Sequence, residues 1–284
     1  MEEHNPHTFC EYEIKSWNDA RKLLSHLNDW VFRGQSNKDW KLQTTLERAS
    51  LVNNADIRAI TSFEKKIIEK FKRRALYYLD KLPESSNTLE WISLIQHHGG
   101  PTRLLDFTYS YYVATYFSIE NALQDSAVFC LNKNLIYKKG LETEKWRGLE
   151  EDEEFGTVDY CNNVLKEQTL SPLVMLIEPF NMHERLSRQQ GLFALPFEGR
   201  QSFEYNLSLT VSKYKKDLPL SYKIDTFEDF QELLKENCLL LKIIIPKKYH
   251  NDIRKDLLSM NITTETLFPG IDGFTKSLIN EFNN

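Results

Sequence analysis

Apolar segments typical of buried strands are concentrated in the second half of the chain, whereas helical patterns dominate the first half. Leu173–Ile177, Gly191–Leu195 and Leu239–Ile245 are short apolar runs, and a proline follows each within two residues. Because strands and helices do not alternate strictly, a doubly wound parallel sheet is disfavoured. The pattern predicts an α+β fold: a single domain over residues 1–284, with a mixed or antiparallel sheet core and an N-terminal helical cap.

Periodicity and helix-ending residues predict the remaining elements. We expect a strand and then a helix within residues 11–29, extended segments at 30–34, 40–43, 127–131 and 263–267, and helices at 61–81, 88–97, 109–122, 181–189, 247–259 and 271–282. In the helix at 61–81, Phe63, Ile67, Phe71 and Leu79 fall near one face, which we expect to be buried. Residues 141–170, with the acidic run Glu150–Glu154, are expected to be an exposed insertion in a core that spans about residues 14–282.

Composition narrows the function classes. The net charge is -5, which argues against a nucleic-acid binder driven by overall charge. Lysines and arginines do crowd residues 65–74, and we interpret them as a solvated helix face. The chain has no apolar run of 18 residues, so we expect no membrane span, and its polar start indicates no secretory signal. The four widely spaced cysteines predict neither a disulfide framework nor a zinc site. A cytoplasmic protein is expected.

One motif carries polar and ionisable groups where a core segment would alternate them with apolar ones. Residues 96–108 read Gln-His-His-Gly-Gly-Pro-Thr-Arg-Leu-Leu-Asp-Phe-Thr and lead into an apolar helical pattern. Two glycines and a proline favour a fixed loop that presents side chains. The segment Trp30–Gln35 is its expected partner upstream, and together they indicate a functional site.

The side chains of these motifs suit an anionic ligand, because guanidinium groups pair with phosphate bidentately and amides and hydroxyls add hydrogen bonds. Gly34 would allow a ligand to approach the backbone. The chain has no Walker-type phosphate loop, dinucleotide fingerprint, metalloprotease helix or nucleophile elbow, so those enzyme classes are disfavoured. The candidate site residues are Arg33, Gly34, Gln35, Gln96, His97, Arg103, Asp106, Thr108, Ser110, Gln189 and Gln190.

These motifs resemble the FRG-domain family, named for its Phe-Arg-Gly motif. The resemblance rests on Phe32–Gln35, on the motif at residues 96–108, on Arg185–Phe193 with its Gln-Gln-Gly, and on Leu267–Gly273. It covers most of the chain and identifies the whole of it as one FRG-type domain. The family suggests a context of bacterial or phage genomes and conflict systems, so the resemblance implies a role as a toxin or in phage defence.

The order of the motifs is also similar to that of ADP-ribosyltransferases. In that superfamily an Arg or His ends an early strand, a hydroxyl-bearing strand runs into a helix, and a Glu or Gln begins a later strand. Arg33, Thr108 with Ser110, and Gln190 stand in that order here. The resemblance implies NAD as the cofactor, no metal, and an enzyme that transfers ADP-ribose or cleaves NAD. Arg33, His97, Asp106 and Gln190 would be catalytic, and the other motif residues would bind NAD.

A carboxylate should stabilise the cation that forms when the nicotinamide–ribose bond breaks. Gln190 is neutral, so Asp106, Glu198, Glu204 or Glu265 would have to supply the charge. The alternatives are a nucleotide- or nucleic-acid-binding sensor without catalysis, and a metal-free nuclease with His97 and Asp106 as base and orienter. The macromolecular target, and any regulatory protein partner, stay open.

Several of these residues also have structural interpretations. Arg103 and Asp106 are close enough in sequence to form a buried ion pair that fixes the loop. His97 can cap a helix end, and Ser110 can cap the helix that follows it.

Overall fold

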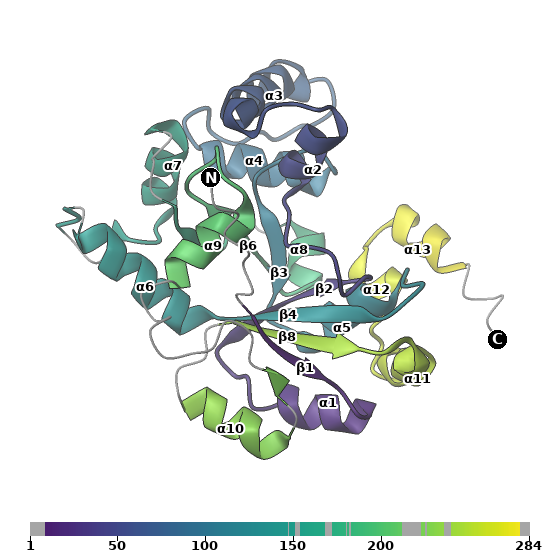
Figure 1. The fold of residues 1–284 in the computed structure, drawn as a ribbon. Helices are drawn as coiled ribbons and strands as arrows, with labels where there is room; N and C mark the ends of the chain where they lie inside the picture. The colour runs from purple at the N-terminus through teal and green to yellow at the C-terminus, as the bar shows by residue number, and fades with distance from the viewer. Residues whose placement is uncertain are drawn as a thin grey trace.

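The computed structural model describes residues 9–146, 148–150, 154–167, 172–179, 181, 183–211, 223–224, 226–235 and 240–278, and every structural statement refers to this part of the chain. One eight-stranded sheet has the order β5-β6-β3-β2-β4-β8-β1-β7 (Figure 1). The strands are β1 (Cys10–Glu13), β2 (Trp30–Gln35), β3 (Leu105–Thr108), β4 (Ser126–Asn132), β5 (Val174–Ile177), β6 (Gly191–Pro196), β7 (Lys223–Ile224) and β8 (Leu240–Ile245). β1 pairs in parallel with β7 and β8, and the other pairs are antiparallel, so the predicted α+β fold with a mixed sheet is confirmed.

Helices cover both faces and both ends of this sheet. They are α1 (Trp17–Leu24), α2 (Thr45–Val52), α3 (Ile60–Ala75), α4 (Thr88–His97), α5 (Tyr111–Ile119), α6 (Lys133–Trp146), α7 (Val158–Glu167), α8 (Glu184–Arg188), α9 (Phe203–Val211), α10 (Phe227–Lys235), α11 (His250–Ser259), α12 (Thr264–Leu267) and α13 (Ile271–Ser277). α2, α3 and α4 gather at one end, at the top of Figure 1, where they form the expected N-terminal helical cap.

The sheet changes direction between its two halves. β3 and β6 run steeply in Figure 1, whereas β4, β8 and β1 run nearly across the view. β2 pairs with β4 over six residues, but β2 and β3 share a single paired position, Phe32 opposite Thr108. The two halves are therefore joined at one point, beyond which Arg33 and the residues after it separate from β3.

Local sequence explains where several helices begin. Ser16 accepts a hydrogen bond from the Asp19 backbone N–H and caps α1, as its position before an apolar pattern predicts. Asn87 caps α4 in the same way, and the Gly99-Gly100-Pro101 turn follows the end of that helix. α4 has its predicted bounds, and α1 lies within the predicted range, because these signals act within a few residues.

Three expected elements differ from the structure. Residues 40–43 join no strand, and residues 105–108 of the motif form strand β3 rather than loop. Residues 263–267 are not extended: Thr263 and Thr266 form a capping box that starts the short helix α12. The sequence pattern also did not predict α2, α9 and α10.

The region at residues 141–170 is more ordered than its composition indicates. α6 and α7 occupy much of it, and Phe155, Cys161 and Val164 are buried in a core cluster with β5 and β6. The acidic run lies partly outside the described residues. Apolar side chains that follow the acidic run are buried against the sheet, and this burial outweighs the charge of the run.

Helix α3 is shorter than expected and only partly buried. It ends at Ala75 instead of near residue 81, and Phe63, which was expected to face the core, is 42% exposed. The buried face carries Ile60, Thr61 and Glu64. A charged partner in the core, rather than an apolar stripe alone, therefore sets the orientation of this helix.

Gly34 lets α5 pack directly on β2. A Cβ at this position would lie 2.0 Å from the Ala114 carbonyl oxygen and 2.5 Å from the Ser118 nitrogen, both backbone atoms of α5. The close approach that we expected for a ligand is thus made by a helix. Any larger residue would have to push α5 away from the sheet.

We expect Gly34→Ala to lower the free energy of unfolding by about 3 kcal/mol or more, because backbone atoms cannot give way as a flexible side chain can. Urea denaturation measures this. Gly99→Ala is the control: it has open space but a φ of +77°, so it should cost only the ~1–2 kcal/mol of a left-handed alanine. Equal losses for the two variants would contradict the packing role of Gly34.

Candidate functional site

Three neighbouring strands bring the main motif residues to one level of the sheet. Phe32 of β2 lies opposite Thr108 of β3, and Thr108 lies opposite Gly191 of β6. Arg33 follows Phe32 and Gln190 precedes Gly191. Arg33, Thr108 and Gln190 therefore lie within one residue of a common level, although 157 residue positions separate the first from the last.

The Arg33 guanidinium lies in the gap that opens between β2 and β3. Its Nη1 donates a hydrogen bond of 2.7 Å to the Asp106 backbone oxygen, while its Nε is enclosed and has no partner among the described residues. Burial lowers the pKa of Arg33; the Asp106 carboxylate opposes this change, and the Arg48 guanidinium adds to it. An enclosed cation with an unused donor, next to a second cation, favours an anion.

Asp106 and Gln96 connect the motif at residues 96–108 with α2. The Gln96 amide donates to the Asp106 carboxylate at 2.9 Å, and its oxygen accepts from the Thr102 hydroxyl at 2.6 Å. The Thr45 hydroxyl donates to the Thr102 carbonyl at 3.1 Å. The exposed Asp106 carboxylate is thus held in place from one side while its other side faces solvent.

Thr108 and the two glutamines join β3 to the segment that follows α8. The Thr108 hydroxyl donates to the Gln189 carbonyl at 2.6 Å, and the Gln189 amide donates to the Leu267 carbonyl at 3.0 Å. Gln190 is exposed and has a positive φ of 47°, a strained conformation for a non-glycine residue. Ser110 accepts from the Val113 N–H and caps α5, as its structural interpretation predicts.

Gln35 is buried and only half satisfied. Its amide donates to the Lys41 carbonyl at 3.2 Å, but its side-chain oxygen has no partner in the described structure. A buried acceptor without a donor costs free energy. This oxygen is a second unused hydrogen-bonding atom on β2, two residues from Arg33.

Arg103, which was expected to bind the ligand, is instead buried in an ion pair with Glu64 of α3. Its exposed fraction is 4%, and its Nε lies 2.7 Å from the Glu64 carboxylate. The alternative pairing with Asp106 is not formed, because Asp106 belongs to the exposed side of β3. Arg103 also donates to the Phe197 carbonyl at 3.4 Å, so it fixes the motif to both α3 and the end of β6.

We expect Arg103→Met or Glu64→Met alone to lower the free energy of unfolding by about 3–5 kcal/mol, because each leaves a buried charge without its partner. The double variant should cost at least about 2 kcal/mol less than the sum of the two. Urea denaturation of all four proteins forms the cycle. Additive losses below about 1 kcal/mol each would show that the pair does not hold the motif in place.

His97 packs against His183, a residue that no sequence motif marks. The ring centroids of His97 and His183 are 3.8 Å apart, and His98 lies 4.8 Å from His97. His183 Nδ1 accepts from the Leu186 N–H and caps α8. Among the hydrogen bonds of the described chain none joins His97 to Asp106, so the base and orienter of the nuclease alternative are not in contact.

Both rings are neutral at physiological pH. Burial lowers the pKa of His97, and the nearby His98 and Arg185 lower it further. Burial, His97, Arg185 and His98 lower the pKa of His183 to about 4. His97 Nδ1 and His183 Nε2 are enclosed without a partner in the described residues. The pair therefore joins the end of α4 to the start of α8.

Since His183 has a lower pKa in the folded chain than its usual value near 6.5, the unfolded chain binds more protons between pH 4 and 6.5. The free energy of unfolding should therefore fall as the pH falls through this window. We expect His183→Asn to weaken that dependence, because asparagine keeps the helix cap without titrating. Urea denaturation at pH 4.5, 5.5 and 6.5 measures it.

His26→Asn, at an exposed position after α1, is the control and should leave the pH dependence of wild type. The solvent that reaches the His183 ring limits the slope to less than the ~1.4 kcal/mol per pH unit of one fully coupled proton. Parallel curves for wild type and His183→Asn would contradict the assignment.

Two structural residues were not found from sequence. His183 and Glu64 act on residues more than ten positions away, so no local pattern marks them. Arg48 of α2 belongs to the family resemblance, behind the Trp40-Lys41-Leu42 segment, but the sequence assigned it no role beside Arg33.

Neither a metal site nor a membrane span is found in the described part of the chain. No group of three His, Cys, Asp or Glu side chains there has a geometry that could hold a metal ion. Within the same ranges, no helix has the length and apolarity needed to cross a membrane. The described cysteines Cys10, Cys130 and Cys161 are buried, and burial raises the pKa of Cys161 to about 12.

The fold and this constellation define an α+β protein with an anion-favouring site at the junction of its sheet. The FRG domain model matches residues 28–127, a range that includes Arg33, the motif at 96–108, Thr108 and α5. The chain therefore contains an FRG domain, and the resemblance to that family is confirmed over these residues. No curated protein and no solved structure matches the chain.

Proposed function

We propose that this protein binds NAD at the β2–β3 gap and breaks the bond between nicotinamide and ribose, transferring ADP-ribose to a target or to water. The observation that carries the proposal is that Arg33 of β2, Thr108 of β3 and Gln190, just before β6, lie within one residue of a common level of the sheet. Their order along the chain is that of the ADP-ribosyltransferase layout, and the sheet makes them neighbours in space.

The residues at the gap fit a dinucleotide. The enclosed Nε of Arg33 and the guanidinium of Arg48 favour a pyrophosphate, which is doubly charged and accepts bidentate hydrogen bonds. The unused side-chain oxygen of Gln35 can accept a hydrogen bond from a ribose hydroxyl, which is a donor. Arg33 and Arg48 would hold the phosphates, and Gln35 would orient the sugar.

The candidates for the missing carboxylate can now be separated. Glu198 pairs with Arg200, and Glu204 accepts from the Leu42 N–H, so both are occupied elsewhere. Glu265 lies on α12, and Asp106 is exposed beside the Arg33 guanidinium. Asp106 is therefore the carboxylate that the proposal assigns to stabilise the developing ribosyl cation.

When bound, NAD supplies the electrophilic ribosyl carbon and the nicotinamide leaving group, which takes the electron pair of the broken bond. Arg33 would hold the pyrophosphate end, and the Asp106 carboxylate would stabilise the positive charge that develops on the ribose. In hydrolysis, water bonds to the same carbon and releases one proton, which a solvent-facing carboxylate can accept. Gln96 keeps Asp106 oriented throughout.

A nucleotide sensor without catalysis is the second candidate. Gln190 is neutral, and the Gln189 side chain is already committed to the Leu267 carbonyl. Such a site binds a nucleotide without a charged group on β6. Binding without turnover would distinguish this candidate from the enzyme. In either form, the family context favours a cytoplasmic effector of a bacterial toxin or phage-defence system, with a target and a regulatory partner still to be found.

Isothermal titration of NAD into the protein, with nicotinamide release assayed on the same samples, tests the proposal. We expect binding and release for wild type, loss of binding by at least about tenfold in Arg33→Ala, and retained binding without release in Asp106→Asn. The charge-assisted hydrogen bonds of Arg33 account for the first loss.

Arg58→Ala removes an exposed guanidinium that pairs with Asp56 on the surface, and it should behave as wild type. If every variant except Arg33→Ala binds NAD and no protein releases nicotinamide, the result would support the sensor instead. If wild type binds no NAD at millimolar concentration, the proposed site is wrong. Thermal melting of each variant shows that a loss does not come from unfolding.

A further inference from the structure

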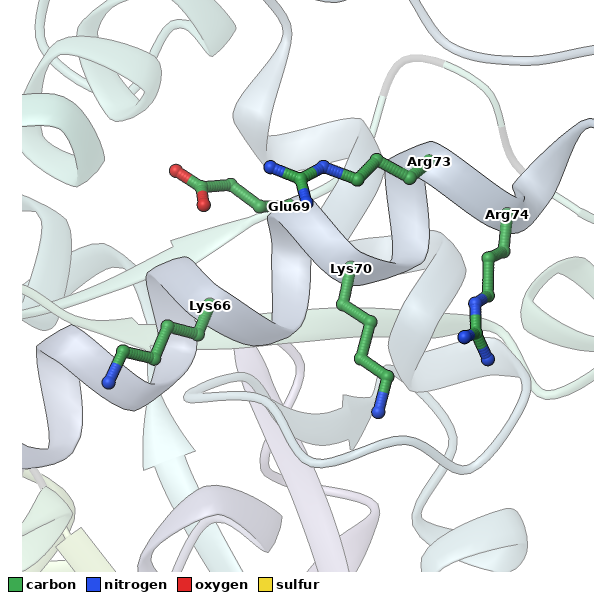
Figure 2. A pocket seen from close by; sticks show the side chains of 5 residues that line it. All are labelled: Lys66, Glu69, Lys70, Arg73 and Arg74. Carbon is green, nitrogen blue, oxygen red and sulfur yellow. The ribbon is translucent and has the colours of Figure 1, made fainter.

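Helix α3 presents a concentrated positive charge to solvent. Residues 65–74 contain six cationic side chains, Lys65, Lys66, Lys70, Lys72, Arg73 and Arg74, and one exposed carboxylate, Glu69. Five of them, Lys66, Glu69, Lys70, Arg73 and Arg74, line a hollow of about 340 Å³ along the helix (Figure 2). The protein as a whole is acidic, so this charge belongs to one surface and not to the average composition.

Lys66, Lys70 and Arg74 form a row along this surface. Their spacing of four residues puts them on one face of the helix, and Figure 2 shows all three side chains extending to the same side. The row covers about 12 Å along the helix axis. No ion pair to any of the three occurs within the described ranges.

Packing and the helix dipole explain only part of this arrangement. Lys72 turns inward, where it donates to the Ser85 carbonyl at 2.8 Å and lies 5.2 Å from the Trp91 ring. Arg73 and Arg74 lie in the last turn, where cations stabilise a helix. Lys65, Lys66 and Lys70 lie earlier, so neither effect accounts for them.

Large exposed side chains continue the basic surface at the end of α3. Tyr77 and Tyr78 are each 81% exposed, and Leu76 is 73% exposed. At the other end of the row, Phe63 is 42% exposed, with the Lys66 ammonium 5.7 Å from its ring centroid. Solvent-facing aromatic rings beside a row of cations are the two components of a surface that binds single-stranded nucleic acid: charge for the backbone and rings for base stacking.

We propose that the outer face of α3, extended by Tyr77 and Tyr78, binds single-stranded nucleic acid. An acidic protein segment would use the cations but gives no reason for two adjacent exposed tyrosines. Glu64, on the opposite face of α3, forms the buried pair with Arg103, so the binding face is fixed to the same loop that builds the NAD site. The proposal does not depend on NAD binding and is tested apart from it.

Fluorescence anisotropy of labelled 12-nucleotide oligo(U) and oligo(dT), between 50 and 200 mM salt, tests the surface. We expect the triple variant Lys66→Gln, Lys70→Gln, Arg74→Gln to bind at least about tenfold more weakly at 50 mM salt. Because each neutralised phosphate of a single strand contributes about 0.7 to the slope of log K against log salt, the slope should fall in magnitude by about 2. Tighter binding of oligo(U) would identify RNA as the ligand, and tighter binding of oligo(dT) would identify DNA.

Lys138→Gln, Lys247→Gln, Lys255→Gln is the matched control, because it removes three exposed cations from α6 and from the region around α11. This control variant should bind the oligonucleotides as tightly as wild type does. Tyr77→Ala, Tyr78→Ala should weaken binding at least about fivefold without changing the salt slope, since stacking releases no counterions. Arg33→Ala should leave oligonucleotide binding unchanged.

A 12-residue polyglutamate peptide serves as the competing acidic ligand. If it displaces the oligonucleotide at equal charge concentration and the tyrosine variant binds normally, the surface recognises acidic protein and the proposal is overturned. Equal losses in the α3 triple variant and the control triple variant would also overturn it, as would the absence of wild-type binding at 50 mM salt.

Discussion

The single paired position between β2 and β3 is the constraint on which the arrangement of this protein depends. Phe32 opposite Thr108 joins the two halves of the sheet, and beyond it the strands separate. The Arg33 guanidinium then satisfies the Asp106 carbonyl that the partner strand leaves free. An enclosed guanidinium with an unused Nε is costly to keep, which is why the gap is the natural position for an anionic ligand.

The candidate site residues divide into those that build this gap and those that face it. Gly34 admits α5, and Arg103 anchors the motif to α3 through Glu64. These two are conspicuous in the sequence, yet their contacts are with the protein itself. Asp106 of β3 and Gln190, just before β6, are both exposed to solvent and have no such structural contact inside the core.

Helix α3 connects the scaffold with the outer surface. On one side, Glu64 holds the motif in place, and on the other, Lys66, Lys70 and Arg74 face solvent and form no ion pair within the described residues. A solvated basic face accounts for the exposure of these cations, but it does not explain the neighbouring exposed tyrosines. A ligand held on this face would lie on a helix that is directly tied to the proposed catalytic loop.

Local signals in the sequence determined much of the fold. The α4 helix has its predicted bounds because Asn87 caps it and glycines end it, and apolar composition correctly placed β4, β5, β6 and β8. The motif residues were also recognisable, since polar groups around a Gly-Gly-Pro turn depart from the alternation of a core segment. Tertiary structure alone decided the partner of Arg103, the stacking of His97 on His183, and the helices within residues 141–170. Each of these depends on groups far apart in the chain, and strand register and burial, which no short window of sequence encodes, bring them together.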